Sequence, residues 1–139
     1  MRTKQVLDTF EQLDNWEARH QFMDELSREL LPLADSEKNG INLVTGCDTP
    51  IWLIGNLTNE DPQRIEYRAD AETPLVRGLV ALLLVPFQRK SPAEVLEIDA
   101  RGYTDKLGLA EHLGESQRVG VEHVIERVYQ IAWGMRGAR

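Results

Sequence analysis

The sequence contains one cysteine, Cys47, so no disulfide can form within the chain. The spacings typical of metal sites, such as CxxC and HExxH, are missing. The three histidines, His20, His112 and His123, fall on different predicted elements. A glycine-rich phosphate loop and a GxSxG nucleophile elbow are also missing. We therefore expect neither a bound metal nor a cofactor.

Long apolar runs are missing as well. The most apolar stretch, Leu79–Val85, is far shorter than the roughly 20 residues that a membrane-spanning helix needs. Residues 1–10 carry charges at Arg2, Lys4 and Asp8 instead of the apolar core of a secretory signal. A lone cysteine suits a reducing compartment. We expect a cytoplasmic protein that does not enter a membrane.

An excess of positive charge is the third absence. The chain holds 23 acidic and 16 basic residues, for a formal net charge of −7. Binding to nucleic acid requires clustered Lys and Arg side chains to neutralise phosphates. Here the basic residues are scattered among acidic ones, so we expect no nucleic-acid partner.

The chain has the size of one compact domain, since domains commonly run to about 100–150 residues. Its hydrophobic content of 42% and mean hydropathy of −0.38 are typical of a globular protein. We expect a single domain over residues 1–139, with the tail after Gly134 frayed.

Helical periodicity marks the N-terminal part of the chain. Apolar residues recur at helical spacing after Thr3, which can serve as an N-cap. Asp14 and Glu17 resemble a capping box that opens a second helix, which ends before Pro32.

The pattern changes to that of strands after the turn dipeptide Asn39-Gly40. Ile41, Leu43 and the run Ile51–Leu57 have the residue types of strands. Polar and apolar residues alternate over Arg64–Ala69, which indicates a half-solvated strand. The connection between the last two segments is short, so we expect an antiparallel hairpin.

Helices return in the second half. Thr73 is expected to cap a helix over Leu75–Val85, and because this stretch is apolar on almost all sides it should lie in the core. Gly78 within it predicts a close approach of another backbone. Ser91 and Ser116 are expected to cap later helices. Together these elements predict an α+β fold, with a small antiparallel sheet of about three strands packed against helices.

Cys47 stands apart because of its position. It follows Gly46 and precedes Pro50 at a junction between strands, so we expect it on a tight loop. Functional residues favour loops on a rigid scaffold, although a free cysteine can also be a small buried apolar residue. A reactive thiol needs neighbouring positive charge, and Asp48 opposes this.

Four segments of the sequence form an ordered pattern. Residues 46–53 read Gly-Cys-Asp-Thr-Pro-Ile-Trp-Leu, residues 69–79 hold an Ala-Asp-Ala-Glu block followed by Leu-Val-Arg-Gly-Leu, and residues 91–96 and 107–113 follow in order. At compatible spacing, these segments resemble the SufE/CsdE family of sulfur acceptors over roughly residues 16–131.

The resemblance implies a SufE/IscU-like fold and a role for the cysteine. Cys47 would take persulfide sulfur from a PLP-dependent cysteine desulfurase of the SufS/CsdA kind and stimulate that enzyme. The sulfur would then pass to a scaffold complex for iron–sulfur cluster assembly. The protein would be a carrier and not an enzyme, and a monomer or weak dimer. We also expect Cys47 to be shielded in the free protein, beside apolar side chains such as Trp52.

The sequence departs from the family pattern at a few positions. Gln117 occupies the place of a common arginine, and Arg118 comes one residue later. One residue rotates a helical side chain by about 100°, so Arg118 need not replace that arginine. Ala71 stands where the family has serine, and Asp48 where glutamine is common.

Three other functions compete with sulfur transfer. A scaffold that builds a cluster needs several thiolate ligands, which one cysteine per chain cannot supply unless chains share the cluster. A thiol peroxidase needs a resolving thiol and a cation beside Cys47. A desulfurase-binding or other interaction module that has lost sulfur transfer is compatible with the changes at Gln117 and Ala71.

Overall fold

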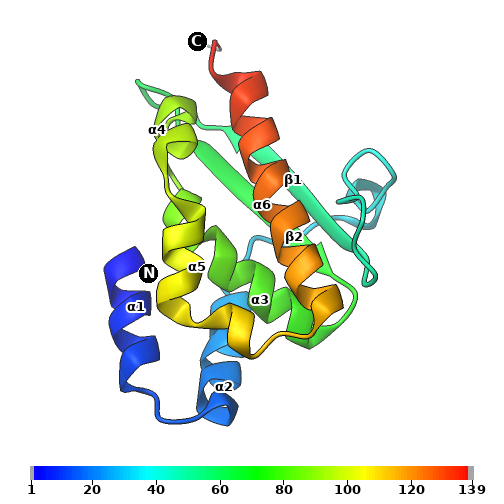
Figure 1. The fold of residues 1–139 in the computed structure, drawn as a ribbon. Coiled ribbons are helices and arrows are strands. Elements are labelled where there is room, and N and C mark those ends of the chain that lie inside the picture. Colours follow the sequence, from blue (N-terminus) through cyan, green and yellow to red (C-terminus); the bar gives the residue numbers. More distant parts are fainter. Residues whose placement is uncertain (1, 138–139) are drawn as a thin grey trace.

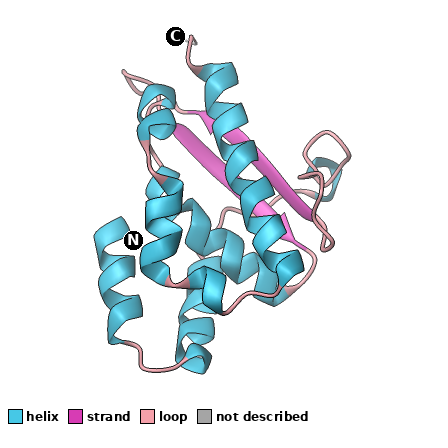
Figure 2. Cartoon of the chain, viewed as in Figure 1, coloured by secondary structure: helices cyan, strands magenta, loops and turns pink. Residues whose placement is uncertain are grey.

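The computed structural model describes residues 2–137, and within that range the chain folds as six α-helices, three short 3-10 helices and one hairpin (Figures 1 and 2). The helices and strands, in chain order, are α1 (Thr3–Gln12), α2 (Trp16–Ser27), η1 (Asp35–Glu37), β1 (Ile51–Leu57), β2 (Ile65–Ala71), α3 (Pro74–Leu84), η2 (Val85–Phe87), α4 (Pro92–Glu97), α5 (Ala100–Leu107), η3 (Leu109–Glu111) and α6 (Glu115–Met135). The predicted α+β fold is confirmed.

The sheet is an antiparallel hairpin of β1 and β2, as the alternating sequence predicted. Successive side chains in a strand point to opposite faces. One face of the hairpin is therefore buried except at Gly55 and Leu57 near the end of β1, and the other face is half-buried or, at Asn56, exposed. The buried face carries Ile51, Leu53, Ile65, Tyr67, Ala69 and Ala71.

The sheet has two strands in the described residues, where about three were expected. Residues 41–44 form an irregular third segment beside β1, with a single bridge between Leu43 and Trp52. Val44 N–H donates to the Ile51 carbonyl at 2.8 Å, and Leu53 N–H donates to the Asn42 carbonyl at 3.0 Å. The turns on either side of these four residues leave too few of them for a regular ladder.

The outer edge of β2 is covered by the segment after α3. The Gln88 side chain accepts a hydrogen bond from Tyr67 N–H at 2.8 Å and donates one to the Tyr67 carbonyl at 2.7 Å. Ile65 N–H donates to the Lys90 carbonyl at 2.8 Å, and Arg89 N–H donates to the Ile65 carbonyl at 3.0 Å. Side chain and backbone thus satisfy the first half of this edge.

Helix α3 occupies the centre of the molecule, as its sequence predicted. Leu79 and Leu83 are 6% and 2% exposed, whereas Leu75 in the first turn is 46% exposed and lies outside the core. A Cβ atom at Gly78 would lie 3.2 Å from the Met23 backbone of α2, which confirms the predicted close approach. Glycine therefore allows α2 and α3 to pack together.

Helix α6 lies along the sheet and contacts β1 (Figure 1). Its apolar positions Val124, Val128 and Ala132 are buried against the rest of the core. The Val128 carbonyl accepts a hydrogen bond from the buried Tyr67 hydroxyl at 3.0 Å. This bond gives a polar group in the core its partner, because buried hydroxyls without one are costly.

Two predicted helix caps are confirmed and three are wrong. Helix α1 is capped by Arg2, and Thr3, the predicted cap, is its first helical residue. Ser91 and Glu94 form the predicted capping box of α4, and Thr73 caps α3. The cap of α2 is Asn15, not Asp14: its side chain accepts from Ala18 N–H at 2.8 Å. Helix α6 begins earlier than predicted, after Gly114, which leaves the Ser116 hydroxyl free for another contact.

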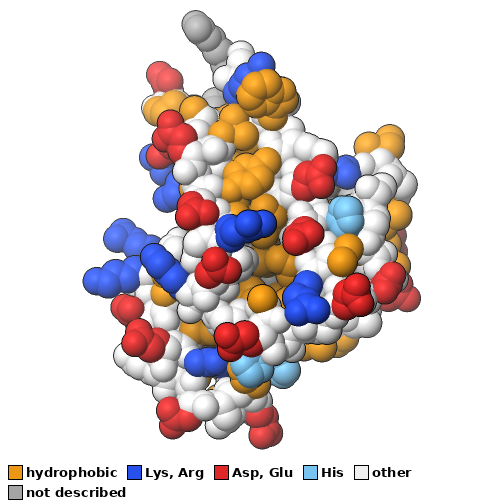
Figure 3. Space-filling model, in the orientation of Figure 1, with side chains coloured by type: hydrophobic (Ala, Val, Ile, Leu, Met, Phe, Trp, Pro, Cys, Tyr) orange, Lys and Arg blue, Asp and Glu red, His pale blue; other side chains and the backbone are white. Residues whose placement is uncertain are grey.

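The ends and the surface complete the description. Helix α6 continues past Gly134 to Met135, and the predicted fraying falls partly on residues 138–139, which lie outside the described range. On the face drawn in Figure 3, acidic and basic side chains are interspersed. None of the described helices is both long and apolar enough to cross a membrane.

Candidate functional site

The segment before β1 presents Cys47 on a tight loop, as predicted. Gly46 has φ +86°, a left-handed conformation that favours glycine, and Pro50 leads directly into β1. Residues 42–44 fix the start of this loop to β1, as described above. The cysteine therefore sits between two fixed points of the backbone.

The Cys47 thiol is half-buried between this loop and α6. Its Sγ lies 3.9 Å from the Gly120 carbonyl oxygen. It faces a small cavity of about 40 Å³, whose wall is mainly apolar. The apolar side chains of that wall are Ile51, Val76, Leu79, Val80, Leu83, Val121 and Val124.

The cavity has room beside the thiol. A site needs roughly 10–15 Å³, measured in the same way, to hold one water molecule. About 40 Å³ is enough for one added atom somewhat larger than a water oxygen. Chemistry that extends the Cys47 side chain by one atom can take place without displacing the wall.

The surroundings of Cys47 disfavour its thiolate. Partial burial raises the pKa of the thiol, and the neighbouring Asp48 carboxylate raises it further. Asp48 accepts a hydrogen bond from the Ser116 hydroxyl at 2.5 Å. No Lys or Arg is among the residues that line this cavity in the described chain. The site itself therefore favours the neutral thiol over the thiolate.

Gln117 and Arg118 occupy different environments, as the expected rotation of a helical side chain indicates. Gln117 lines the cavity beside Cys47. Arg118 lines a separate, larger cavity between α5 and α6, where it donates to the Ala110 carbonyl at 3.4 Å. Arg118 thus brings no positive charge to Cys47 from within this chain.

Trp52 is not among the residues that line the Cys47 cavity. Ile51 lines it, and because side chains alternate along a strand, Trp52 belongs to the opposite face of β1. There Lys38 Nζ lies 5.9 Å from the centre of its ring. The prediction that Trp52 lies beside the thiol is therefore wrong, and the aliphatic side chains of the cavity wall take that place.

Ala71 is a buried residue of β2, directly after Asp70. Asp70 pairs with Lys38 at 2.8 Å and with Arg77 at 2.7 Å. Burial alone would raise the pKa of Asp70, but the hydrogen bonds from Lys38, Arg77 and the Ala71 backbone lower it. The carboxylate thus fixes the segment around Lys38 to the hairpin and to α3.

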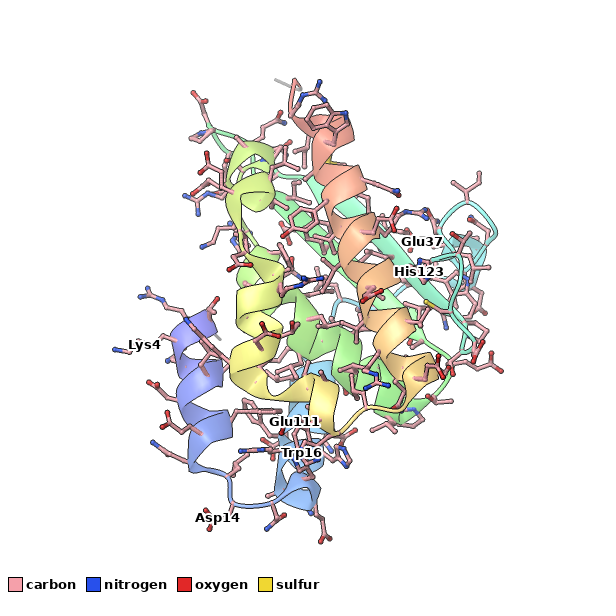
Figure 4. The ribbon with its side chains drawn as sticks, in the orientation of Figure 1. Lys4, Asp14, Trp16, Glu37, Glu111 and His123 are labelled. Carbon is pink, nitrogen blue, oxygen red and sulfur yellow. The ribbon has the colours of Figure 1, made fainter. Side chains whose placement is uncertain are left out.

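The three histidines do not come together as a metal site. His20 and His112 both lie beside Trp16, with ring centres 6.0 and 4.0 Å from it. His123 lies on α6 and extends toward the segment before β1 (Figure 4). Residues 2–137 contain no group of three or more His, Cys, Asp or Glu side chains that could hold a metal ion.

Sequence reasoning missed the residues of α6 that contact the cysteine loop, namely Ser116, Gly120, His123 and Arg127. Their spacing along one side of a helix was present in the sequence. Three of them are polar, a pattern typical of a solvent-exposed helix face, so the sequence did not indicate that this side of α6 contacts the cysteine loop.

Comparison with known proteins identifies the family. The family model described as "SufE: Fe-S metabolism associated domain" matches residues 4–132. This chain belongs to the SufE family. An uncharacterized SufE-like protein of Rhizobium meliloti is 34% identical over 132 residues, which cover 94% of each chain. A second, from Rhizobium etli, is 32% identical over 130 residues, which cover 92% of this chain and 87% of the relative.

A solved structure supports the SufE fold. The solution structure of a hypothetical protein from Thermus thermophilus matches with a TM-score of 0.74. The match covers 95% of this chain and 93% of that one, at 24% sequence identity. The likeness extends to the fold alone, and the family membership associates the chain with iron–sulfur metabolism.

Proposed function

We propose that this protein accepts persulfide sulfur on Cys47 from a PLP-dependent cysteine desulfurase of the SufS/CsdA kind and carries it toward iron–sulfur cluster assembly. The observation that carries the proposal is the geometry of the one thiol in the chain. Cys47 lies half-buried on a loop and faces a mainly apolar cavity with room for about one more atom. The membership in the SufE family supports the same role.

The transfer is an exchange between sulfur atoms. The Cys47 thiolate attacks the outer sulfur of the desulfurase persulfide, a new S–S bond forms, and the old S–S bond breaks. The desulfurase cysteine leaves as a thiolate, and the proton on the transferred sulfur moves with it. No external oxidant or reductant is needed, because one persulfide replaces another.

The partner has two tasks in this step. It must expose Cys47, since a half-buried thiol cannot reach a second active site. It must also supply positive charge, because the site itself raises the pKa of the thiol and its lining holds no Lys or Arg. The protein then acts as a carrier that stimulates the desulfurase by removing its persulfide, and it is not itself an enzyme.

The test is sulfur uptake. The protein is incubated with the desulfurase and cysteine, without reductant, and its intact mass is measured. We expect the mass of one added sulfur atom on the wild type and none on Cys47→Ser, which should fold and bind the desulfurase normally. If the wild type gains no sulfur while the desulfurase turns over, Cys47 is not the acceptor.

A second candidate is a module that binds and stimulates the desulfurase without accepting sulfur. The observation that favours it is Gln117, which lines the Cys47 cavity where a cation would activate the thiol. The Cys47→Ser variant distinguishes the two functions. If it stimulates the desulfurase as well as the wild type does, the interaction module is the better description.

A further inference from the structure

One side of α6 contacts the cysteine loop along its length. Ser116, Gly120, His123 and Arg127 are spaced by four, three and four positions, so they lie on one side of a helix with 3.6 residues per turn. We call these four residues the α6 strip. Along it they contact Asp48, Cys47, Gly46 and residues 41–43, in reverse chain order.

Arg127 fixes the base of the loop. Its guanidinium donates to the Leu43 carbonyl at 3.2 Å and to the Ile41 carbonyl at 2.5 Å. The backbone of Asn42 and Val44 bonds to β1 on the opposite side. Arg127 therefore bridges the two carbonyls of this edge that point away from the sheet, and the planar fork of arginine suits two acceptors at once.

His123 covers the turn beside the cysteine. A Cβ atom at Gly46 would lie 2.5 Å from His123 Nε2, so the imidazole lies against the glycine where a side chain would otherwise stand. In Figure 4 His123 extends from α6 toward this segment. One turn earlier, the buried Gly120 lies against the cysteine, because a Cβ atom there would be 3.8 Å from Cys47 Sγ.

We propose that Arg127 and His123 are positioning residues for Cys47, which hold residues 41–47 against α6 and thereby limit access to the thiol. Arg127 holds the base of the loop by charged hydrogen bonds, and His123 holds its turn by packing. The contacts of Arg127 exchange readily for water or for a partner's groups, because the net stability of such bonds is modest. A docking partner can then displace the turn at Gly46 and Cys47 while Val44, a buried core residue, stays in place.

The test is the rate at which iodoacetamide, an uncharged reagent, labels Cys47 in the isolated protein. Loss of a hydrogen bond from a charged group should raise the open population, so Arg127→Met should label about tenfold faster than wild type. His123→Ala should label about threefold faster, because it removes only packing around one turn. Arg127→Lys, which keeps the charge but loses the fork, should fall between wild type and Arg127→Met.

Matched variants separate the α6 strip from general effects. Arg118→Met removes an arginine from another side of α6, and His20→Ala removes an exposed histidine. Both should label at the wild-type rate. Release of the loop alone gives labelling that is nearly independent of urea well below the unfolding midpoint, whereas general destabilisation makes labelling rise with urea throughout.

The proposal is overturned if Arg127→Met and His123→Ala label within twofold of wild type, or if Arg118→Met accelerates labelling as much as they do. A steep urea dependence of the accelerated labelling at low urea also overturns it. The role of this restraint in sulfur transfer rests on the proposed function, but the labelling experiment needs no desulfurase. Failure here leaves sulfur uptake by Cys47 untouched, and failure of sulfur uptake leaves the labelling result intact.

Discussion

The two faces of the β1–β2 hairpin are held in different ways. The inner face is mainly apolar and is buried against the core, except at Gly55 and Leu57 near the end of β1. The outer face carries Arg68 and Asp70, which form ion pairs with Glu37 and Lys38 of the segment that leads to the cysteine loop. Apolar burial scales with area and cannot be exchanged for water cheaply, whereas an ion pair near the surface can. Glu37 and Lys38, at the start of the segment that leads to Cys47, are therefore attached by the contacts that open most readily.

The largest effect should come from the inner face. Leu53 is 1% exposed, so Leu53→Ala should lower the free energy of unfolding by about 2–5 kcal/mol through lost burial and a cavity. The adjacent Ile54 belongs to the half-buried outer face, so Ile54→Ala is the matched control and should cost clearly less. Urea unfolding of both variants measures the difference. Equal losses would mean that the two faces are not held differently.

An intermediate effect, on the pKa of Cys47, should come from a charge placed in the cavity beside the thiol. Gln117→Arg places a guanidinium in the cavity, which should lower the pKa of the thiol by about one unit, as a cation near an ionisable group does. The pH dependence of Cys47 alkylation measures that pKa. Val119→Arg adds the same charge two residues away, outside the cavity, and should shift it little. If both variants give the same shift, the cavity has no special influence on the thiol.

The smallest effect should come from the ion pair of the outer face. The pKa of Glu37 is lowered from 4.5 to about 2, first by its hydrogen bonds with Arg68. A carboxylate with a lowered pKa in the folded state stabilises the fold above its unfolded pKa, and this contribution is lost as the pH falls through the folded pKa. Wild type should thus be more stable than Glu37→Gln at neutral pH.

The difference between wild type and Glu37→Gln should shrink as the pH falls from about 4.5 to about 2, which unfolding midpoints at several pH values can follow. In an Arg68→Met background the pH-dependent effect of Glu37→Gln should be smaller, because the hydrogen bond from Ala34 N–H still lowers the pKa of Glu37 but the larger contribution of Arg68 is gone. A difference that stays constant down to pH 2 would show that the ion pair does not hold the segment.

The sequence predicts the elements whose cause is local. The alternation over residues 64–69 indicates the hairpin, the capping residues of α4 indicate its start, and the apolar run indicates that α3 is central. The different directions of the neighbouring Gln117 and Arg118 side chains also have a local cause, because one residue along a helix rotates the side chain to another face. That expectation agrees with their separate cavities.

The contacts that shape the site could not be predicted in the same way, because they join residues far apart in the chain. Arg127 bonds to Ile41 across 86 positions, and Ser116 bonds to Asp48 across 68. Ser116 has the residue type of a helix cap, and only the position of α6 against the loop gives it a different partner. The third strand was overestimated because Ile41 and Leu43 have strand character but too little room for a ladder.

The side chain of Gln88 has a consequence for how other proteins can bind. Its amide pairs with the Tyr67 backbone as a neighbouring strand would, and Ile65 pairs with the backbone of Arg89 and Lys90. The unpaired N–H and C=O groups of a strand edge can form hydrogen bonds with a strand of another chain, which extends the sheet. At Ile65 and Tyr67 the backbone groups of this edge already have partners, so another protein cannot pair a strand with them. A protein that binds this region must contact its side chains instead.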